Sequence, residues 1–197
     1  MDKHISSEAP TLSQLKNELE RERSKSRYRS LLWSTFFALV IVAAFSILAA
    51  MLWFPVLEIY GESMTPTLSE GEVVVSVKTH GMHRGELVAF YLGNKILVKR
   101  CIALPGDTVI IDEDGFVSVN GTQLDEPYVS ERALGECDLE FPYIVPQERY
   151  FLLGDHRETS IDSRSSVVGC ISKEDLVGRV FLRLWPLDKL SRIGGSG

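Results

Sequence analysis

Residues 31–57 form an uncharged apolar stretch that restricts the fold more than any other feature of the chain. No charged side chain occurs between Leu31 and Leu57, and Glu58 is the first charge that follows. An α-helix rises about 1.5 Å per residue, so about 20 residues cross a hydrocarbon core about 30 Å thick. A buried core helix and a cleaved signal sequence are the alternatives, but the apolar core of a signal sequence has only about 7–15 residues. A retained transmembrane helix is therefore predicted at residues 31–57.

Charges on the two sides of this stretch differ in sign. Residues 1–30 carry seven Lys and Arg against five Asp and Glu, whereas residues 58–197 carry fourteen against twenty-two. Positively charged flanks of a membrane helix stay in the cytoplasm. The chain is therefore expected in the cell membrane as a single-pass protein, with a cytoplasmic N-terminus and an extracytoplasmic domain after Leu57. Because that domain is acidic, nucleic acid is excluded as a partner.

The part after the apolar stretch has the pattern of β-structure. Seven segments are rich in β-branched and aromatic residues and are bounded by Gly, Pro, Asp and Asn: residues 73–77, 87–92, 95–104, 108–112, 116–121, 150–155 and 178–186. Asn120-Gly121 is typical of a hairpin turn. Ser172 is expected to cap a short helical turn within residues 172–179.

These segments predict a mostly β protein: an antiparallel, partly closed β domain on a single N-terminal transmembrane helix. Its parts are a cytoplasmic polar arm, the transmembrane helix, the extracytoplasmic β domain and a flexible tail, at residues 1–30, 31–57, 58–190 and 191–197. Leucines at helical spacing in the arm favour a short helix that leads into the span or lies on the membrane surface. The final GGSG has the composition of a flexible linker.

Three cysteines occur in the β domain. An odd number leaves at least one thiol unpaired in an exported domain. Cys101 lies in an apolar strand and is expected to be a small buried hydrophobic residue. Spacing alone leaves a disulfide between Cys137 and Cys170 open. Because there is no Cys-x-x-Cys motif and no Cys/His cluster, neither a metal nor a cofactor is predicted.

Ser63, in the segment SMTPTL, is a candidate nucleophile that lacks an obvious base nearby. A serine hydroxyl is a weak nucleophile until a neighbour accepts its proton. Among the four histidines, His4 lies on the arm, and His80 and His83 lie in a polar turn. His156 is therefore the one histidine that is a serious candidate for a Ser-His arrangement.

Lys99, in the strand ILVKRCIAL, offers another base. Side chains alternate between the two faces of a strand, so Lys99 and Arg100 point in opposite directions. One of them must point where a sheet buries apolar groups, and Arg100 is expected to be the solvated one. A lysine is protonated at its ordinary pKa of about 10.4, but burial can lower that pKa by about 3–5 units. Ser-Lys pairs are a known variant of serine protease chemistry.

Four motifs in the same order resemble those of the type I signal peptidases, the membrane-bound serine proteases that remove signal peptides from exported preproteins. They are SMTPTL (63–68), RGELVAF (84–90), LVKRCIALPGD (97–107) and GDHRETSIDSR (154–164). The resemblance extends from the apolar stretch to about Pro186. A lysine where some members have a histidine, and a single span, are similar to bacterial members of the smaller, Gram-positive type.

The resemblance implies roles for individual residues. Ser63 would be the nucleophile, Lys99 its general base, and Ser160 the residue that orients the lysine. Gly61 stands where some members have a serine that helps to bind the oxyanion, so that role would rest on the Ser63 N–H. A polar scaffold behind the site would consist of Asp155, Arg157, Asp162 and Arg164. Substrate would be bound by Leu57, Ile59, Met64, Leu97 and Val98.

The resemblance also implies the activity: cleavage of preproteins after small residues of the A-x-A type through an acyl-enzyme, without a cofactor. The implied partners are preprotein signal peptides, the lipid bilayer and, indirectly, the Sec and Tat export machinery. Three alternatives stay open. They are another Ser-Lys protease of the self-cleaving repressor family, a non-catalytic anchored β domain, and a Ser-His hydrolase that uses His156.

Overall fold

The computed structural model describes residues 12–79 and 81–193. The chain divides into two compact units between Ala50 and Met51. One α-helix, α1 (Leu12–Trp53), precedes the strands β1 (Val56–Glu58), β2 (Val73–Val77), β3 (Leu87–Leu92), β4 (Lys95–Ala103), β5 (Thr108–Ile111), β6 (Val117–Val119), β7 (Thr122–Gln123), β8 (Tyr143–Ile144), β9 (Arg149–Leu153), β10 (Ile171–Ser172), β11 (Leu176–Trp185) and β12 (Ser191–Arg192). Two 3₁₀ turns, η1 (Lys173–Asp175) and η2 (Leu187–Lys189), flank β11.

Helix α1 begins before the start of the predicted transmembrane span and ends before the end of that span. It begins at Leu12 because the arm is rich in Leu, Glu, Lys, Arg and Gln, which favour helix. The segment Tyr28–Trp53 is long and apolar enough to cross a membrane, with a mean hydropathy of 2.6. The prediction that the helix continues to Leu57 is wrong, because Pro55 lacks an N–H and disfavours helical geometry at Phe54. Residues 1–11 of the predicted arm lie outside the described residues.

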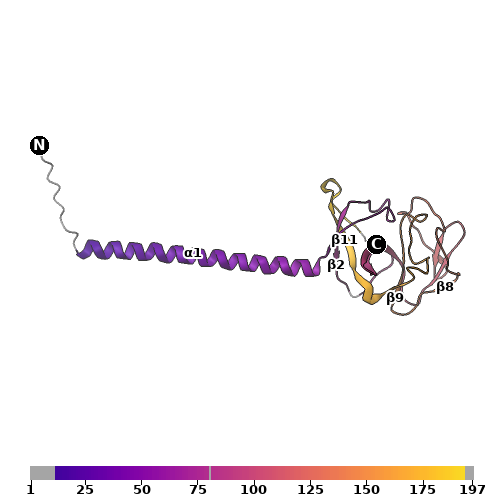
Figure 1. The fold of residues 1–197 in the computed structure, drawn as a ribbon, viewed down its shortest axis with the longest axis horizontal. Coiled ribbons are helices and arrows are strands. Elements are labelled where there is room, and N and C mark those ends of the chain that lie inside the picture. Colours follow the sequence, from indigo (N-terminus) through magenta and orange to yellow (C-terminus); the bar gives the residue numbers. More distant parts are fainter. Residues whose placement is uncertain (1–11, 80, 194–197) are drawn as a thin grey trace. The chain divides into compact units, whose positions relative to one another are not determined.

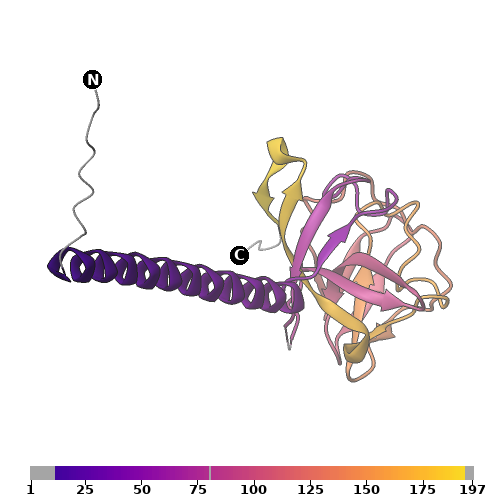
Figure 2. The ribbon, with the colours of Figure 1, turned by 60° about the vertical axis from the view of Figure 1, so that its left-hand side comes forward.

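The strands form two antiparallel sheets (Figures 1 and 2). The larger sheet has the order β1-β2-β11-β3-β4-β9-β10, and β12 adds to β11. The smaller sheet has the order β7-β6-β5-β8. The prediction of a mostly β, antiparallel domain with one N-terminal apolar helix is confirmed. Within the described residues each sheet is open, with a free strand at either end of its order.

Local patterns located most of the longer strands. β2 and β3 have the predicted bounds, and Asn120-Gly121 turns β6 into β7 with φ angles of 52° and 78°. Ser172 caps η1, and its Oγ accepts a hydrogen bond from the Glu174 N–H at 3.3 Å. The strands that were not predicted, β1, β7, β8, β10 and β12, have two or three residues each, too few for a periodic pattern.

The predicted flexible tail at 191–197 begins too early. Residues 191–192 form β12, and the Ile193 N–H donates to the Phe181 carbonyl at 2.9 Å. Ile193 is buried in the same apolar cluster as Met64 and Leu68, which explains why this part of the tail is ordered. Residues 194–197 lie outside the described residues.

All three cysteines are free thiols, so no disulfide joins Cys137 to Cys170. Cys101 is fully buried in an apolar cluster between β3, β4 and β9, as predicted. Burial raises the pKa of the Cys101 thiol to about 12. It is therefore a packing residue rather than a nucleophile.

Candidate active site

Ser63 lies in the turn between β1 and β2, beside a groove in the β domain. The turn is anchored by Met64 and Leu68, which are buried in the core, and the Leu68 N–H donates to the Met64 carbonyl at 2.8 Å. Ser63 itself is half-buried and lines the groove. Within residues 12–79 and 81–193, neither its hydroxyl nor its N–H has a hydrogen-bond partner. Both groups are therefore free to act on a ligand.

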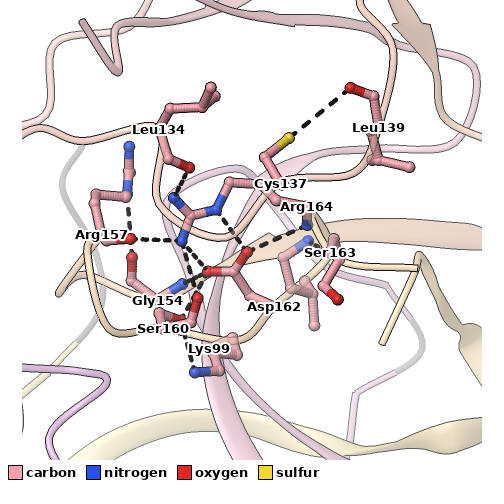
Figure 3. A network of polar contacts seen from close by, with 12 residues as sticks. Lys99, Leu134, Cys137, Leu139, Gly154, Arg157, Ser160, Asp162, Ser163 and Arg164 are labelled. Atoms are coloured by element: carbon pink, nitrogen blue, oxygen red, sulfur yellow. Dashed lines mark hydrogen bonds and ion pairs between the residues drawn. The ribbon is translucent and has the colours of Figure 1, made fainter. Parts of the chain in front are cut away.

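Lys99 lies on β4 with only 3% of its surface exposed. Its Nζ donates to Ser160 Oγ at 2.9 Å, and Ser160 Oγ donates to Asp162 Oδ2 at 2.7 Å (Figure 3). Because the single hydroxyl hydrogen of Ser160 is directed to the Asp162 carboxylate, its oxygen is left to accept from the lysine. Ser160 thus holds the Lys99 amine in one orientation.

Burial lowers the pKa of Lys99 from 10.5 to about 8. The nearby Asp162 and Asp155 carboxylates raise this pKa and the Arg164 guanidinium lowers it, but the loss of hydration is the largest effect. A substantial fraction of the amine is therefore neutral at mildly alkaline pH, as a general base requires.

Gly154, at the end of β9, brings the two halves of the site together. A Cβ atom at this position would overlap Ser160 Oγ and would lie 2.5 Å from the Ser63 carbonyl oxygen. The backbone of Ser63 and the side chain that holds Lys99 therefore contact the same point of the chain. No hydrogen bond joins Ser63 Oγ to Lys99 Nζ in the described part of the chain.

Asp162 and Arg164 form a fully buried ion pair behind Ser160. Arg164 Nε donates to Asp162 Oδ1 at 2.8 Å and Nη2 to Oδ2 at 2.9 Å. The remaining guanidinium hydrogens reach backbone carbonyls, including that of Leu134 at 2.6 Å (Figure 3). The Gly154 N–H also donates to Asp162 at 2.9 Å. Asp162 and Arg164 therefore form an interior polar scaffold with its hydrogen bonds satisfied.

Arg100 is buried, which corrects the expectation that it points to solvent. It is 6% exposed, and its Nε and Nη2 donate to Asp155 at 2.8 and 2.6 Å. This carboxylate also accepts from Thr67 Oγ1 at 2.5 Å. A bidentate counter-ion makes burial of the guanidinium feasible on the face opposite Lys99. Asp155 thereby ties the strand of Lys99 to the turn of Ser63.

The groove next to Ser63 has a volume of about 710 Å³ and is mainly apolar. It is lined by all five residues predicted to bind substrate: Leu57, Ile59, Met64, Leu97 and Val98. One wall is β1, the terminal strand of its sheet, and the other is residues 95–98 of β4, which pair only with β3. Two strand edges that have no neighbouring strand among the described residues therefore face the groove.

Two other residues singled out from the sequence have different surroundings. Gly61 is exposed with φ = 79°, a conformation that glycine adopts readily, and its Cβ position is open. The His156 ring bonds Thr159 Oγ1 at 2.7 Å rather than the Ser63 hydroxyl. The His156 backbone N–H instead donates to the Ser63 carbonyl at 3.2 Å, so this residue holds the turn through its main chain.

Three residues near the site were missed from the sequence. Glu126 pairs with Arg157, Tyr128 stacks on Arg100, and Arg183 donates to the Thr67 carbonyl at 2.6 Å. Their partners lie 28 to 116 residues away along the chain, so no local pattern marks them. No group of three or more His, Cys, Asp or Glu suited to a metal ion occurs among the described residues.

Comparison with known proteins shows the family of the chain. A family model described as "Signal peptidase, peptidase S26" matches residues 31–185. Signal peptidase IB of Staphylococcus aureus (strain COL) is 37% identical over 151 residues, 66% of this chain and 78% of the relative. Signal peptidase I U of Bacillus subtilis (strain 168) is 30% identical over 165 residues, 78% of this chain and 87% of the relative.

A crystal structure of a signal peptidase I from Enterococcus faecalis V583 has 28% sequence identity and a TM-score of 0.41, and it covers 50% of this chain and 96% of its own. The family match spans most of the chain, from the apolar helix to the end of β11, and includes all four motifs. The chain therefore belongs to the signal peptidase family, peptidase S26, as a bacterial type I signal peptidase.

Proposed function

We propose that this peptidase removes signal peptides from exported preproteins with Ser63 as nucleophile and Lys99 as general base. The observation that carries the proposal is the buried Lys99 amine, which donates to Ser160. In the same site, the Ser63 hydroxyl has no hydrogen-bond partner in the described chain. Family membership supports the peptidase activity.

The chemistry follows from the groups present. A neutral lysine amine has two N–H groups and one lone pair; one N–H is donated to Ser160, and the lone pair accepts the Ser63 proton. Ser63 Oγ then attacks the scissile carbonyl, whose oxyanion is bound by the Ser63 N–H. The Lys99 ammonium protonates the leaving amine, which leaves an acyl-enzyme. Water, deprotonated by the same lysine, attacks the ester and releases Ser63.

Direct contact between Ser63 and Lys99 would form when substrate binds. Catalytic hydrogen bonds are often long or misaligned without substrate and tighten in the Michaelis complex. A preprotein that fills the groove would exclude water from the half-buried Ser63 hydroxyl, leaving the lysine lone pair as its acceptor.

The cleavage segment would bind as an extended strand between β1 and residues 95–98 of β4. Both edges have backbone groups without strand neighbours, and an added strand would bond to them. An extended chain rises about 3.3 Å per residue, so β1 and residues 95–98 of β4 would together contact roughly three or four substrate residues. Leu57, Ile59 and Val98 would form shallow apolar pockets suited to small side chains, which matches cleavage after A-x-A sequences.

Anchoring by α1 would hold the site near the membrane in which signal peptides lie. The cationic residues before the apolar segment favour a cytoplasmic N-terminus and an extracytoplasmic β domain. The substrates would then be preproteins delivered across the bilayer by the Sec and Tat machinery, which makes that machinery an indirect partner.

A preprotein-processing assay in liposomes with the full chain tests the dyad. Ser63→Ala and Lys99→Ala are each expected to reduce the cleavage rate by about three orders of magnitude or more. His156→Ala is the matched control, because its ring bonds only Thr159 within the described chain. That variant should cleave at nearly the normal rate.

Each alternative has its own signature in this assay. Full processing by Ser63→Ala would favour a non-catalytic anchored domain. Normal activity in Lys99→Ala, with loss in His156→Ala, would favour a Ser-His hydrolase. Cleavage of the chain itself, without processing of preproteins, would favour the self-cleaving type of Ser-Lys protease.

A further inference from the structure

Three buried arginines surround the candidate base, and each is paired with one carboxylate. Two of these pairs, Arg100–Asp155 and Arg164–Asp162, join residues of the sequence motifs. The carboxylate of the third pair comes from outside them: Glu126, in the segment after β7, receives two hydrogen bonds from Arg157, at 2.5 and 3.1 Å. Each of these two side chains is only 1% exposed.

Arg157 fixes the loop that connects the two halves of the site. Its Nε donates to the Gly154 carbonyl at 3.1 Å, and its own carbonyl accepts from Arg164 at 2.8 Å. That loop contacts the Ser63 backbone and carries Ser160. A guanidinium buried this deeply needs its carboxylate partner, because an uncompensated charge in the interior is strongly unfavourable.

Tyr128 connects the same segment to the strand of the base. Its hydroxyl donates to Glu126 Oε1 at 3.0 Å. Its ring lies 3.8 Å from the guanidinium carbon of Arg100, the residue that follows Lys99 on β4. A cation over an aromatic face is held electrostatically as well as by packing. Tyr128 therefore contacts the arginine that follows Lys99, and Glu126 contacts the arginine of the loop that carries Ser160.

We propose that Glu126 and Tyr128 are positioning residues of the active site: Glu126 orients the Ser160 loop through Arg157, and Tyr128 orients the Lys99 strand through Arg100. Neither residue lines the groove, so neither would touch the substrate. The inference rests on the proposed role of Lys99 as the base and adds residues from the smaller-sheet region to the catalytic arrangement.

Glu126 also balances the charge around Lys99. Asp162, Arg164 and Asp155 act on the pKa of the amine, and the Arg157–Glu126 pair adjoins them because Arg164 donates to the Arg157 carbonyl. Removing the Glu126 charge leaves the Arg157 cation uncompensated, which disfavours an ammonium at Lys99. The neutral base would then persist to lower pH.

The test is the pH dependence of preprotein cleavage by the full-length Glu126→Gln variant. We expect kcat to fall about tenfold with KM within about twofold, since the loop is loosened while the groove is intact. The acid limb of the kcat/KM profile should move to lower pH by about half a pH unit or more. This is the pKa change expected at Lys99 when one unit charge is removed nearby at an effective dielectric constant near 20. Glu126→Asp keeps the charge and should restore the position of that limb.

Tyr128 provides a second, independent pair of variants. Tyr128→Phe keeps the ring over Arg100 and should keep kcat within about twofold, whereas Tyr128→Ala should lower kcat about tenfold. If Glu126→Gln fails to fold, this pair and Glu126→Asp decide the question. Wild-type kcat in Tyr128→Ala would then overturn the proposal.

Asp107→Asn is the matched control for a lost buried charge. Asp107 is 8% exposed and paired with Arg84, but it contacts none of the residues of the proposed site. Its variant should lose thermal stability without a change in kcat or in the pH profile. The positioning proposal falls if Glu126→Gln has the kcat and pH profile of the wild type. Activity that survives Lys99→Ala would instead overturn the dyad itself.

Discussion

The environment of Lys99 shows how the pKa of a lysine can fall although carboxylates lie nearby. Asp162 and Asp155 lie close enough to favour its ammonium, yet the pKa falls to about 8. Each carboxylate is already bonded to a guanidinium, Asp162 to Arg164 and Asp155 to Arg100, so little of its charge is left to stabilise Lys99. Desolvation therefore outweighs attraction. This fall in the pKa of Lys99 means that the protein destabilises the ammonium relative to the neutral amine by roughly 3 kcal/mol.

The pH dependence of cleavage should report this lysine. Because neutral Lys99 is the form that the proposed mechanism requires, kcat/KM is expected to rise with pH and to level off above about 8, the pKa of the buried amine. The measurement is initial-rate cleavage of a preprotein from pH 6 to 10 in the same liposomes. A profile that is flat across pH 7–9 would contradict the assignment of the base.

Stability should improve when the lysine is replaced by an apolar residue. The folded pKa of Lys99 is below its unfolded value, so the cost of burying the ammonium is full below pH 8 and disappears as pH approaches 10.5. Lys99→Met should therefore be inactive and more stable by about 1–3 kcal/mol at pH 6, with a smaller gain at pH 10. Denaturant unfolding at both pH values measures it, and a gain that is equal at both would exclude this cause.

Gly154 has no room for a side chain. Alanine at this position would push against Ser160 and the Ser63 carbonyl, two groups of the proposed machinery. Gly154→Ala is expected to reduce cleavage at least about 100-fold and to destabilise the fold by about 1–3 kcal/mol. Gly81→Ala is the control, because a Cβ there meets nothing within 4 Å and its φ is ordinary. Equal activity of the two variants would disprove the close approach.

At the scale of elements, the groove exists because two strand edges lack a neighbouring strand in the part of the chain that the structure describes. β1 ends the order of the larger sheet, and the first half of β4 extends past β9, which pairs only with residues from Arg100 onward. A strand edge without a partner readily accepts another extended chain. The same two elements carry the apolar side chains that line the groove, so backbone recognition and side-chain selection would occur together.

The walls of the groove should determine which residues are accepted before the scissile bond. Val98→Ala removes bulk from one wall of the groove. We expect this variant to raise about tenfold the rate at which preproteins with Val at the third position before the scissile bond are cleaved, relative to preproteins with Ala there. Ile110→Ala, on an exposed position of β5 in the smaller sheet, is the control and should leave selectivity unchanged. Unaltered selectivity in Val98→Ala would argue against binding in this groove.

At the scale of the whole molecule, the chain combines an apolar helix with a folded β domain. Its helical segment Tyr28–Trp53 is exposed along its entire length in the isolated chain, as expected of a segment that lipid surrounds. A protease added outside spheroplasts should digest the β domain and leave the cytoplasmic arm protected. In inverted vesicles, a tag at the N-terminus should be removed instead. The reverse pattern would refute the proposed orientation.

A residue of the candidate site could be predicted where a motif close to it in the sequence marks it, and was missed where its interaction partner lies far along the chain. Ser63, Val98, Lys99 and Ser160 could be proposed because they lie within motifs, and Leu57 because it lies shortly before one of them. Arg100 was assigned to solvent because strand alternation says nothing of a carboxylate 55 residues further along the chain. Glu126 was missed for the same reason, since its arginine lies 31 residues away.

By itself, the sequence determined the apolar helix, most of the longer strands and the hairpin at Asn120-Gly121, because these depend on hydrophobic runs, side-chain alternation and turn residues close together in the chain. Only the tertiary structure decided which charges are buried and which carboxylate meets each arginine. Burial of charge depends on partners brought together by folding. Lys99 therefore owes its low pKa to packing, because an isolated strand would leave the same lysine hydrated and protonated.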